Sequence, residues 1–327
     1  MSRVAWIYIC LLPALIVMAI VNMTQGAVPI PISELIPILA GKGDSHFEYI
    51  LMNYRLPRLL LAVMVGGGLA LAGVILQNII RNPLASPDVI GLSKGSGLAA
   101  VIVIVLLPNA PAGMIPWAAF LGASSVGMLL FIISLKLHVR PAALALSGMA
   151  LGTAAGAGIQ YITVKHMDDA NTALLWLAGS LWGRTWEHVL MLLPWIAVLV
   201  PTILFMSRHM DLLNLGDDIA EGLGIPVTKT RVILLGIAVC LTGASVAVSG
   251  TIGFVGLVAP HMARRIVGSL HRQLLPISAM LGALLVMTAD MIGRVVIVPR
   301  EIPVGIVTAI IGAPYFLYLL RRSIKNK

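Results

Sequence analysis

The chain is a series of apolar runs separated by short polar connections. Ten runs can be read, at 4–23, 59–80, 92–107, 114–135, 142–164, 188–206, 231–250, 254–269, 274–292 and 303–320. Most are close to the roughly 20 apolar residues that an α-helix needs to cross about 30 Å of hydrocarbon. The runs at 92–107 and 254–269 are short, so we expect spans there that Gly and Pro break or extend. The pattern predicts an all-α polytopic membrane protein, a single domain over 1–327 with about ten transmembrane helices.

An even number of spans places both termini on the same side of the membrane, and the distribution of basic residues predicts the cytoplasmic side. Of the 22 Lys and Arg residues, seven then lie outside and the other fifteen lie inside: Arg3, Arg81, Lys94, Lys136, Arg140, Arg208, Lys229, Arg231, Arg264, Arg265, Arg272, Arg321, Arg322, Lys325 and Lys327. The first run could instead be a cleaved signal peptide. Its removal would put the basic C-terminal tail outside, so a retained first helix is the simpler interpretation.

Composition excludes several classes of protein. Hydrophobic residues make up 59% of the chain, charged residues 11%, and the mean hydropathy is +1.00, which is outside the range of soluble domains. The net charge of +9 comes without a basic stripe interleaved with aromatics, so a nucleic-acid partner is not expected. Cys10 and Cys240 lie far apart in apolar runs and are expected to be packing residues. No His pairs with Cys or carboxylates at ligand spacing, so we expect no metal site and no cofactor.

Two kinds of catalytic chemistry have weak support. A phosphate-binding G-x-x-x-x-G-K-[ST] loop is absent from the sequence, so ATP hydrolysis would belong to another chain. The G-x-S-x-G spacing at 91–95 follows a Pro-containing loop rather than a strand, so we expect Ser93 to cap a helix.

An ion-coupled secondary transporter would need intramembrane carboxylates, and Asp290 is the one acid within a run. Arg294 follows it at i+4, so an intrahelical ion pair explains Asp290 at least as well as a proton relay does.

The connection at about 207–229 breaks the basic pattern of the inner side. Acidic residues are rare on that side, yet Asp217 and Asp218 open a short segment that ends at Gly224 and Pro226. We expect a short helix whose N-terminus the two aspartates favour, with Ile219 and Leu223 on one face. A solvated loop is the alternative, and an apolar-faced helix would serve as a docking element.

Small residues recur along the run at 142–164, where Gly148, Gly152 and Gly156 are spaced four apart. They predict a smooth helix face. Tight packing against a neighbouring helix is one interpretation. A helix that lines a wide path is the other.

Four segments carry a resemblance to a known family: Arg55-Leu-Pro-Arg58, Gln77 to Gly91, Gly253 to Arg264 and Glu301 to Pro314. Here the sequence resembles the FecCD permease family, the membrane subunits of type II ABC importers for ferric siderophores, haem and cobalamin. The similarity spans nearly the whole chain. It implies a multi-pass permease of the bacterial cytoplasmic (inner) membrane that pairs with an identical or paralogous permease along the transport path. Its other partners would be two ATPase subunits and an extracytoplasmic binding protein.

The resemblance also implies roles for particular residues. Arg55, Arg58 and Arg294 match outer-face arginines that pair with glutamates of the binding protein; snorkelling to lipid headgroups is the alternative. The 207–229 connection matches the loop that docks into the ATPase and couples its closure to the permease, with these candidate residues: Leu215, Gly216, Asp217, Asp218, Ile219, Glu221, Leu223 and Gly224.

The inner gate is where the sequence departs from the family. Some members carry small hydroxyl residues before the fifth helix, and this chain has Arg140-Pro-Ala-Ala143. Asn82, Pro83 and Pro141 are assigned to the gate region, with Gly148, Gly152 and Gly156 along the path. A wide path with few polar groups discriminates little, so selection would belong to the binding protein. We expect a ferric siderophore as cargo, with haem and cobalamin as alternatives.

Overall fold

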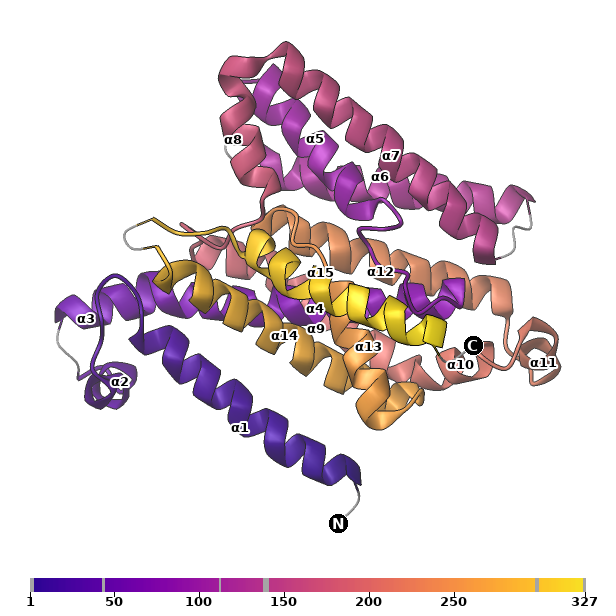
Figure 1. The fold of residues 1–327 in the computed structure, drawn as a ribbon, viewed down its shortest axis with the longest axis horizontal. Coiled ribbons are helices and arrows are strands. Elements are labelled where there is room, and N and C mark those ends of the chain that lie inside the picture. Colours follow the sequence, from indigo (N-terminus) through magenta and orange to yellow (C-terminus); the bar gives the residue numbers. More distant parts are fainter. Residues whose placement is uncertain (1–2, 43–44, 112, 138–140, 298–299, 326–327) are drawn as a thin grey trace.

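The computed structural model describes residues 3–42, 45–111, 113–137, 141–297 and 300–325, and within these ranges it is helical with no strand (Figure 1). The helices are α1 (Arg3–Thr24), α2 (Ile32–Leu39), α3 (Ser45–Ile50), the π-helix η1 (Leu51–Arg55), α4 (Leu56–Ile80), α5 (Leu92–Leu106), α6 (Met114–Leu137), α7 (Pro141–Lys165), α8 (Met167–Leu177), α9 (Trp186–Phe205), α10 (Ser207–Leu213), α11 (Asp217–Gly222), α12 (Val227–Ser249), α13 (Val255–Val267), α14 (His271–Val295) and α15 (Val304–Lys325).

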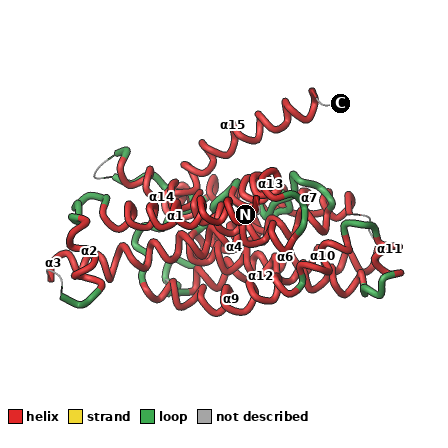
Figure 2. The backbone as a smooth tube through the Cα atoms, turned by 90° about the horizontal axis from the view of Figure 1, so that it is seen from below, coloured by secondary structure: helices red, strands yellow, loops and turns green. Residues whose placement is uncertain are grey.

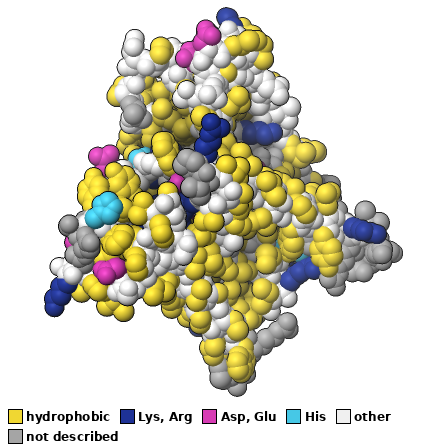
Figure 3. Space-filling model, turned by 60° about the vertical axis from the view of Figure 1, so that its left-hand side comes forward, with side chains coloured by type: hydrophobic (Ala, Val, Ile, Leu, Met, Phe, Trp, Pro, Cys, Tyr) yellow, Lys and Arg dark blue, Asp and Glu magenta, His cyan; other side chains and the backbone are white. Residues whose placement is uncertain are grey.

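Seven helical stretches among the described residues are long and apolar enough to cross a membrane: Val4–Thr24, His46–Ile80, Met114–Ile133, Ala142–Lys165, Trp186–Phe205, Val227–Ser249 and His271–Val295. Leu92–Leu106 and Val304–Tyr318 are shorter apolar helices. Hydrophobic side chains cover most of the face in Figure 3. The chain is therefore a multi-pass membrane protein. Each of the ten predicted runs falls on a helix, while ten crossings and cytoplasmic termini stay predictions.

Helix α4 is the centre of the larger helical group. It is buried along most of its length and packs against α12, α13 and α14. Glycines allow the closest approaches: a methyl group on Gly66 would overlap the backbone of Gly282, and one on Gly73 would overlap that of Gly256. In lipid, where apolar burial gives little drive, such backbone contact supplies much of the packing energy.

Helices α5, α6, α7 and α8 form a second group, at the top of Figure 1. Helix α12 joins it to the first group by packing against both α4 and α6. Helix α1 lies along α14, where the Asn22 amide donates to the Met287 carbonyl at 3.3 Å, so the first run is an integral part of the fold. Helix α15 extends away from the bundle toward the C-terminus (Figure 2).

The predicted break near 254 is present, and other local features differ from prediction. Helix α12 ends at Ser249 and α13 begins at Val255, with Phe254 between them at a φ of 67°. The expectation that Ser93 caps a helix is wrong, because α5 starts after Gly91 with no side-chain cap and Ser93 is buried. Helices α2, α3, α8 and α10 were not predicted, since they are too short or too polar to read as spans.

Candidate docking surfaces and transport path

The predicted short helix in the 207–229 connection is confirmed as α11, which follows α10 in a hairpin. We call residues 207–226 the coupling hairpin. Leu215, Ile219 and Leu223 are 56%, 53% and 58% exposed, whereas Ala220 is fully buried. Ile219 and Leu223 are four positions apart across α11 and share a helix face, and Leu215 lies just before the helix, next to Gly216. We call these three exposed side chains the apolar stripe. Exposed apolar stripes of this kind are typical of protein docking sites.

Asp217 fixes this hairpin to the bundle. Its carboxylate accepts from Arg231 of α12, at 2.9 Å from Nη1 to Oδ2 and 2.7 Å from Nη2 to Oδ1. Arg81, at the left-handed C-cap of α4, donates from Nη2 to Asp217 Oδ1 at 2.5 Å and to the Leu213 carbonyl at 3.0 Å. Partial burial acts to raise the pKa of Asp217, but Arg231 and Arg81 outweigh it and hold the pKa below its ordinary value.

Two further contacts tie α10 to the bundle. The Asp211 carboxylate accepts from the backbone N–H of His271 at 2.9 Å, and its Oδ1 lies 2.6 Å from His271 Nδ1. The Asn78 amide donates to the Met210 carbonyl at 3.0 Å and to Asn214 Oδ1 at 2.9 Å. The hairpin is therefore held by α4, α12 and α14 together.

At the opposite end of α4, Arg58 joins three segments of the chain. Its Nε donates to Asp290 Oδ1 of α14 at 2.9 Å, and Nη2 donates to Glu301 Oε2, just before α15, at 2.7 Å. Arg294 Nε lies 3.2 Å from Asp290 Oδ2, so the predicted i, i+4 pair is confirmed. Asp290 is therefore paired with two arginines and is not a free intramembrane acid.

Arg55 and Arg294 bind backbone and amide oxygens of the α1 end. Arg55 Nη1 donates to the carbonyls of Met23 at 2.6 Å and Thr24 at 2.9 Å. Arg294 Nη2 donates to Asn22 Oδ1 at 2.5 Å. Both arginines are buried, and Arg58 is paired with Asp290 and Glu301, so all three predicted docking arginines are engaged within the chain in this conformation. Burial also removes the lipid-snorkelling alternative, and their role in docking stays a prediction.

The glycine face of α7 divides into two parts. Side chains added at Gly148 and Gly152 would overlap the backbone of Ile90 and Gly91, so these positions serve close packing against the start of α5. Gly156 has no atom near its missing side chain among the described residues and faces open space. The packing interpretation is supported for the first two positions, and a pathway role stays a prediction for the third.

Two of the predicted gate residues lie directly after Arg81, which contacts Asp217 of the hairpin. Asn82 and Pro83 are exposed in the connection after α4, where Asn82 Oδ1 accepts from the Leu84 backbone N–H at 2.9 Å. Pro141 is the first residue of α7, and Arg140 lies outside the described residues. The gate assignment stays untested. Across the described ranges, no three His, Cys, Asp or Glu side chains gather as metal ligands.

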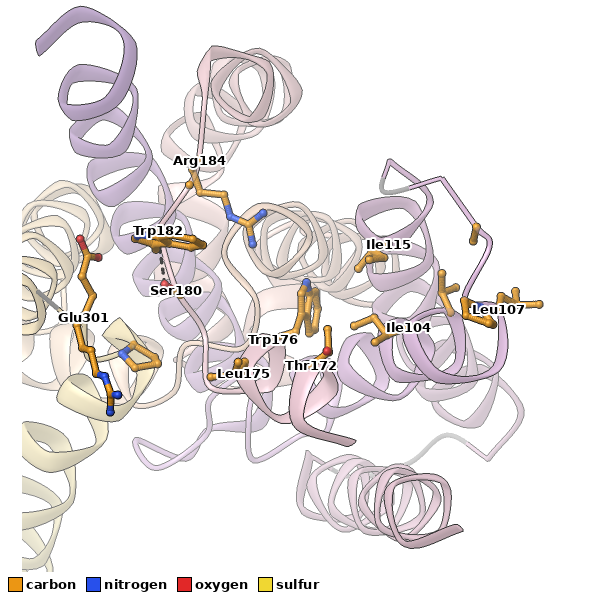
Figure 4. A pocket seen from close by; sticks show the side chains of 16 residues that line it. Ile104, Leu107, Ile115, Thr172, Leu175, Trp176, Ser180, Trp182, Arg184 and Glu301 are labelled. Carbon is orange, nitrogen blue, oxygen red and sulfur yellow. Dashed lines mark hydrogen bonds between the residues drawn. The ribbon is translucent and has the colours of Figure 1, made fainter. Parts of the chain in front are cut away.

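A cavity of about 940 Å³ lies at the same end as Glu301, between α5, α6, α8 and the segments that precede α9 and α15. We call it the outer pocket (Figure 4). Trp176, Trp182, Arg184, Arg300 and Glu301 are among its lining residues. Sequence analysis did not single it out, because its lining comes from three separated stretches of the chain, 103–115, 172–184 and 300–303.

The apolar helices define a polytopic helical membrane protein, and its hairpin carries an exposed apolar stripe. The chain belongs to the FecCD transport family, whose pattern it matches over residues 14–322. It is therefore a transport component, and ATP hydrolysis in such importers is carried by a separate ATPase.

The chain is similar to several named permeases and to one solved transporter structure. The chain is 51% identical to the Fe(3+)-citrate import system permease protein YfmE of Bacillus subtilis, over 94% of this chain and 92% of that one. It is 45% identical to the Fe(3+) dicitrate transport system permease protein FecD of Escherichia coli, over 93% and 94%. Relatives named for hydroxamate, cobalamin and hemin import are 37 to 39% identical. An inward-facing structure of a metal-chelate type ABC transporter superposes with a TM-score of 0.88 at 30% identity, covering 97% of this chain and 99% of that chain.

Proposed function

We propose that this chain is the membrane-spanning half of a binding-protein-dependent ABC importer that moves a ferric chelate across the bacterial cytoplasmic membrane. The observation that carries this function is the apolar stripe of Leu215, Ile219 and Leu223 on a hairpin anchored through Asp217. An exposed stripe gives an ATPase a surface to push, and the anchors give it a rigid connection to the bundle. The proposed topology has ten crossings and both termini in the cytoplasm, which puts this hairpin on the ATPase side.

The proposed partners follow from this arrangement. Two ATPase subunits bind the coupling hairpins of two permease chains, which are identical or paralogous. A binding protein delivers the cargo to the opposite face. Family membership supports all three partners.

The proposed cargo is an iron–siderophore complex of the ferric citrate type. The support is that the relatives at 51% and 45% identity, from two organisms, are both named for ferric citrate. Haem and cobalamin are the alternative cargoes, because relatives at lower identity are named for them. An ion-coupled mechanism is disfavoured because Asp290 is engaged by two arginines.

The docking role of the outer arginines is proposed in a narrower form. Arg58 and Glu301 have side chains that are 12% and 26% exposed, so this pair is within reach of a partner. A carboxylate of a binding protein would compete with Glu301 for Arg58. Arg55 and Arg294 would act by holding α1, α4 and α14 in position.

Transport by the reconstituted complex tests the function. The permease is placed in liposomes with its ATPase, its partner permease and its binding protein, and uptake of ⁵⁵Fe-citrate is followed. We expect uptake that requires ATP and the binding protein and survives collapse of the ion gradients. Uptake abolished by an ionophore and independent of ATP would instead establish a secondary transporter.

A further inference from the structure

The outer pocket combines aromatic walls with cationic groups. Trp182 and Trp176 lie on either side of the space into which the Arg184 side chain extends (Figure 4). Ser180 and Thr172 add hydroxyl groups to the lining. A volume of about 940 Å³ is at the upper end of the range for small-ligand sites, which reaches roughly 1,000 Å³.

Arg184 is held in the pocket without an anionic partner among the described residues. Its Nη1 lies 3.2 Å from His188 Nε2, and its Nε is buried without a hydrogen bond. His188 Nδ1 accepts from the Thr185 backbone N–H at 3.3 Å, so in the neutral ring Nε2 carries the proton and is a poor acceptor for a guanidinium. Burial lowers the pKa of Arg184, and an anion bound in the pocket would offset that cost.

The pocket as a whole is positive. Arg300 lines it, is exposed, and makes no ion pair with any residue that the structure describes. Glu301 is the one acidic side chain in the described lining, and its charge is taken up by Arg58 at 2.7 Å. Two guanidinium groups without a carboxylate partner among the described residues, from different segments of one cavity, suit by their charge a ligand that carries several carboxylates.

We propose that the outer pocket is an anion-selective subsite for the cargo, in which Arg184 and Arg300 bind carboxylates of a ferric chelate. The tryptophans supply apolar walls and indole N–H donors. The inference deepens the proposed import function and rests on it for its role in transport. The subsite gives this chain a role in selectivity, because its positive charge favours polycarboxylate chelates over ferric trihydroxamates of zero net charge.

Binding to the isolated full-length permease in nanodiscs tests the site. Ferric citrate should quench tryptophan fluorescence saturably, since Trp176 and Trp182 line the pocket, and iron-free citrate should compete. Arg184→Gln combined with Arg300→Gln should weaken binding at least tenfold, which corresponds to about 1.4 kcal/mol. Lys165→Gln, an exposed cation at the end of α7 outside the lining, is the matched control and should bind as wild type does.

Uptake by the reconstituted complex separates this inference from the proposed function. The double variant should import ferric citrate at least tenfold more slowly, while ATPase stimulation by the binding protein changes less than twofold. The inference is overturned if wild-type permease shows no saturable quenching by millimolar ferric citrate, if the double variant binds as tightly as wild type, or if ATPase stimulation falls as much as uptake does. A wild-type complex that binds ferric citrate but never imports it refutes the proposed function and leaves the site standing.

Discussion

Arg231 binds the carboxylate of Asp217 with both terminal nitrogens, at 2.7 and 2.9 Å, and so ties the coupling hairpin to the first turns of α12. The two residues are fourteen positions apart, and Arg81 adds a third element at 2.5 Å. A bidentate pair fixes orientation as well as distance. Movement of α11 is therefore expected to be transmitted to α4 and α12 rather than absorbed within the loop.

Loss of the Asp217 charge should loosen the hairpin. Asp217→Asn is expected to reduce cargo imported per ATP and to raise hydrogen exchange in residues 207–226 by roughly two- to fivefold, since partly exposed ion pairs each contribute at most about 1 kcal/mol. Asp218→Asn is the control, because that neighbour is exposed and has no ion pair among the described residues. Equal effects of the two variants would argue against the anchor.

The same pair predicts a pH dependence. The folded-state pKa of Asp217 is below its ordinary value. The stabilisation that its ionised carboxylate gives the hairpin is therefore fully present above the ordinary carboxyl pKa near 4, and it is lost as pH falls through the lowered pKa. Wild-type hairpin exchange, corrected for the intrinsic rate, should therefore rise in acid. The Asp217→Asn variant should lack that rise, and a rise of the same size in both would assign it to other groups.

The apolar stripe should be needed for coupling and dispensable for folding. Leu223→Asp puts a charge on a docking face that is already exposed, so the permease should reach the membrane in normal amount and stay monodisperse. ATP hydrolysis stimulated by the binding protein should no longer be coupled to uptake, so uptake should fall at least tenfold while hydrolysis continues. Gly216→Pro should act in the same direction, because Pro cannot adopt the φ of 115° found there.

Two control variants test whether the effect of Leu223→Asp is specific to the exposed stripe. Asp169→Asn changes an exposed carboxylate on α8, outside the coupling hairpin, and should leave uptake unchanged. Leu213→Asp buries a charge in the core and should abolish accumulation of the permease. Normal import by Leu223→Asp, or its disappearance from the membrane, would contradict a docking role for this stripe.

Sequence patterns predicted what depends on local chain chemistry. The span positions follow from apolar length, and α11 follows from acidic residues before an apolar face and a Gly-Ile-Pro ending. These signals are contained within one segment, so they can be read without knowing the partners. The helices α8 and α10 carried no such signal, because they are neither long nor strongly apolar.

The outer charged cluster could not be predicted in the same way. Arg58 meets Asp290 across 232 positions and Glu301 across 243, and nothing in either local sequence specifies the partner. Sequence analysis assigned Arg58 only partners outside the chain, a binding protein or lipid headgroups, whereas the fold makes it the link between α4, α14 and the start of α15. The outer pocket was missed for the same reason.

Topology is tested with single cysteines in a background where Cys10 and Cys240 are replaced by Ser. A membrane-impermeant thiol reagent added to intact cells should label Asp168→Cys, at the start of α8, and should not label Asp218→Cys in the coupling hairpin. Opened membranes should allow both to react. Labelling of position 218 from outside would overturn the proposed ten-span orientation.

The last prediction concerns the outer charged cluster, which consists of Arg58, Asp290, Arg294 and Glu301. It distinguishes a structural role of Arg58 from a docking role. Arg58→Gln leaves Asp290 buried without its main partner, so it should lower the stability of the permease by about 3–5 kcal/mol, whereas Glu301→Gln removes a more exposed partner and should cost about 1 kcal/mol or less. Thermal unfolding in detergent measures both. If docking carboxylates compete for Arg58, Glu301→Gln should speed association of the binding protein with permease nanodiscs, because it removes the internal competitor. The gain should shrink as ionic strength rises. A stability loss for Arg58→Gln, together with association rates that Glu301→Gln and salt leave unchanged, would make Arg58 a purely structural link between α4, α14 and α15.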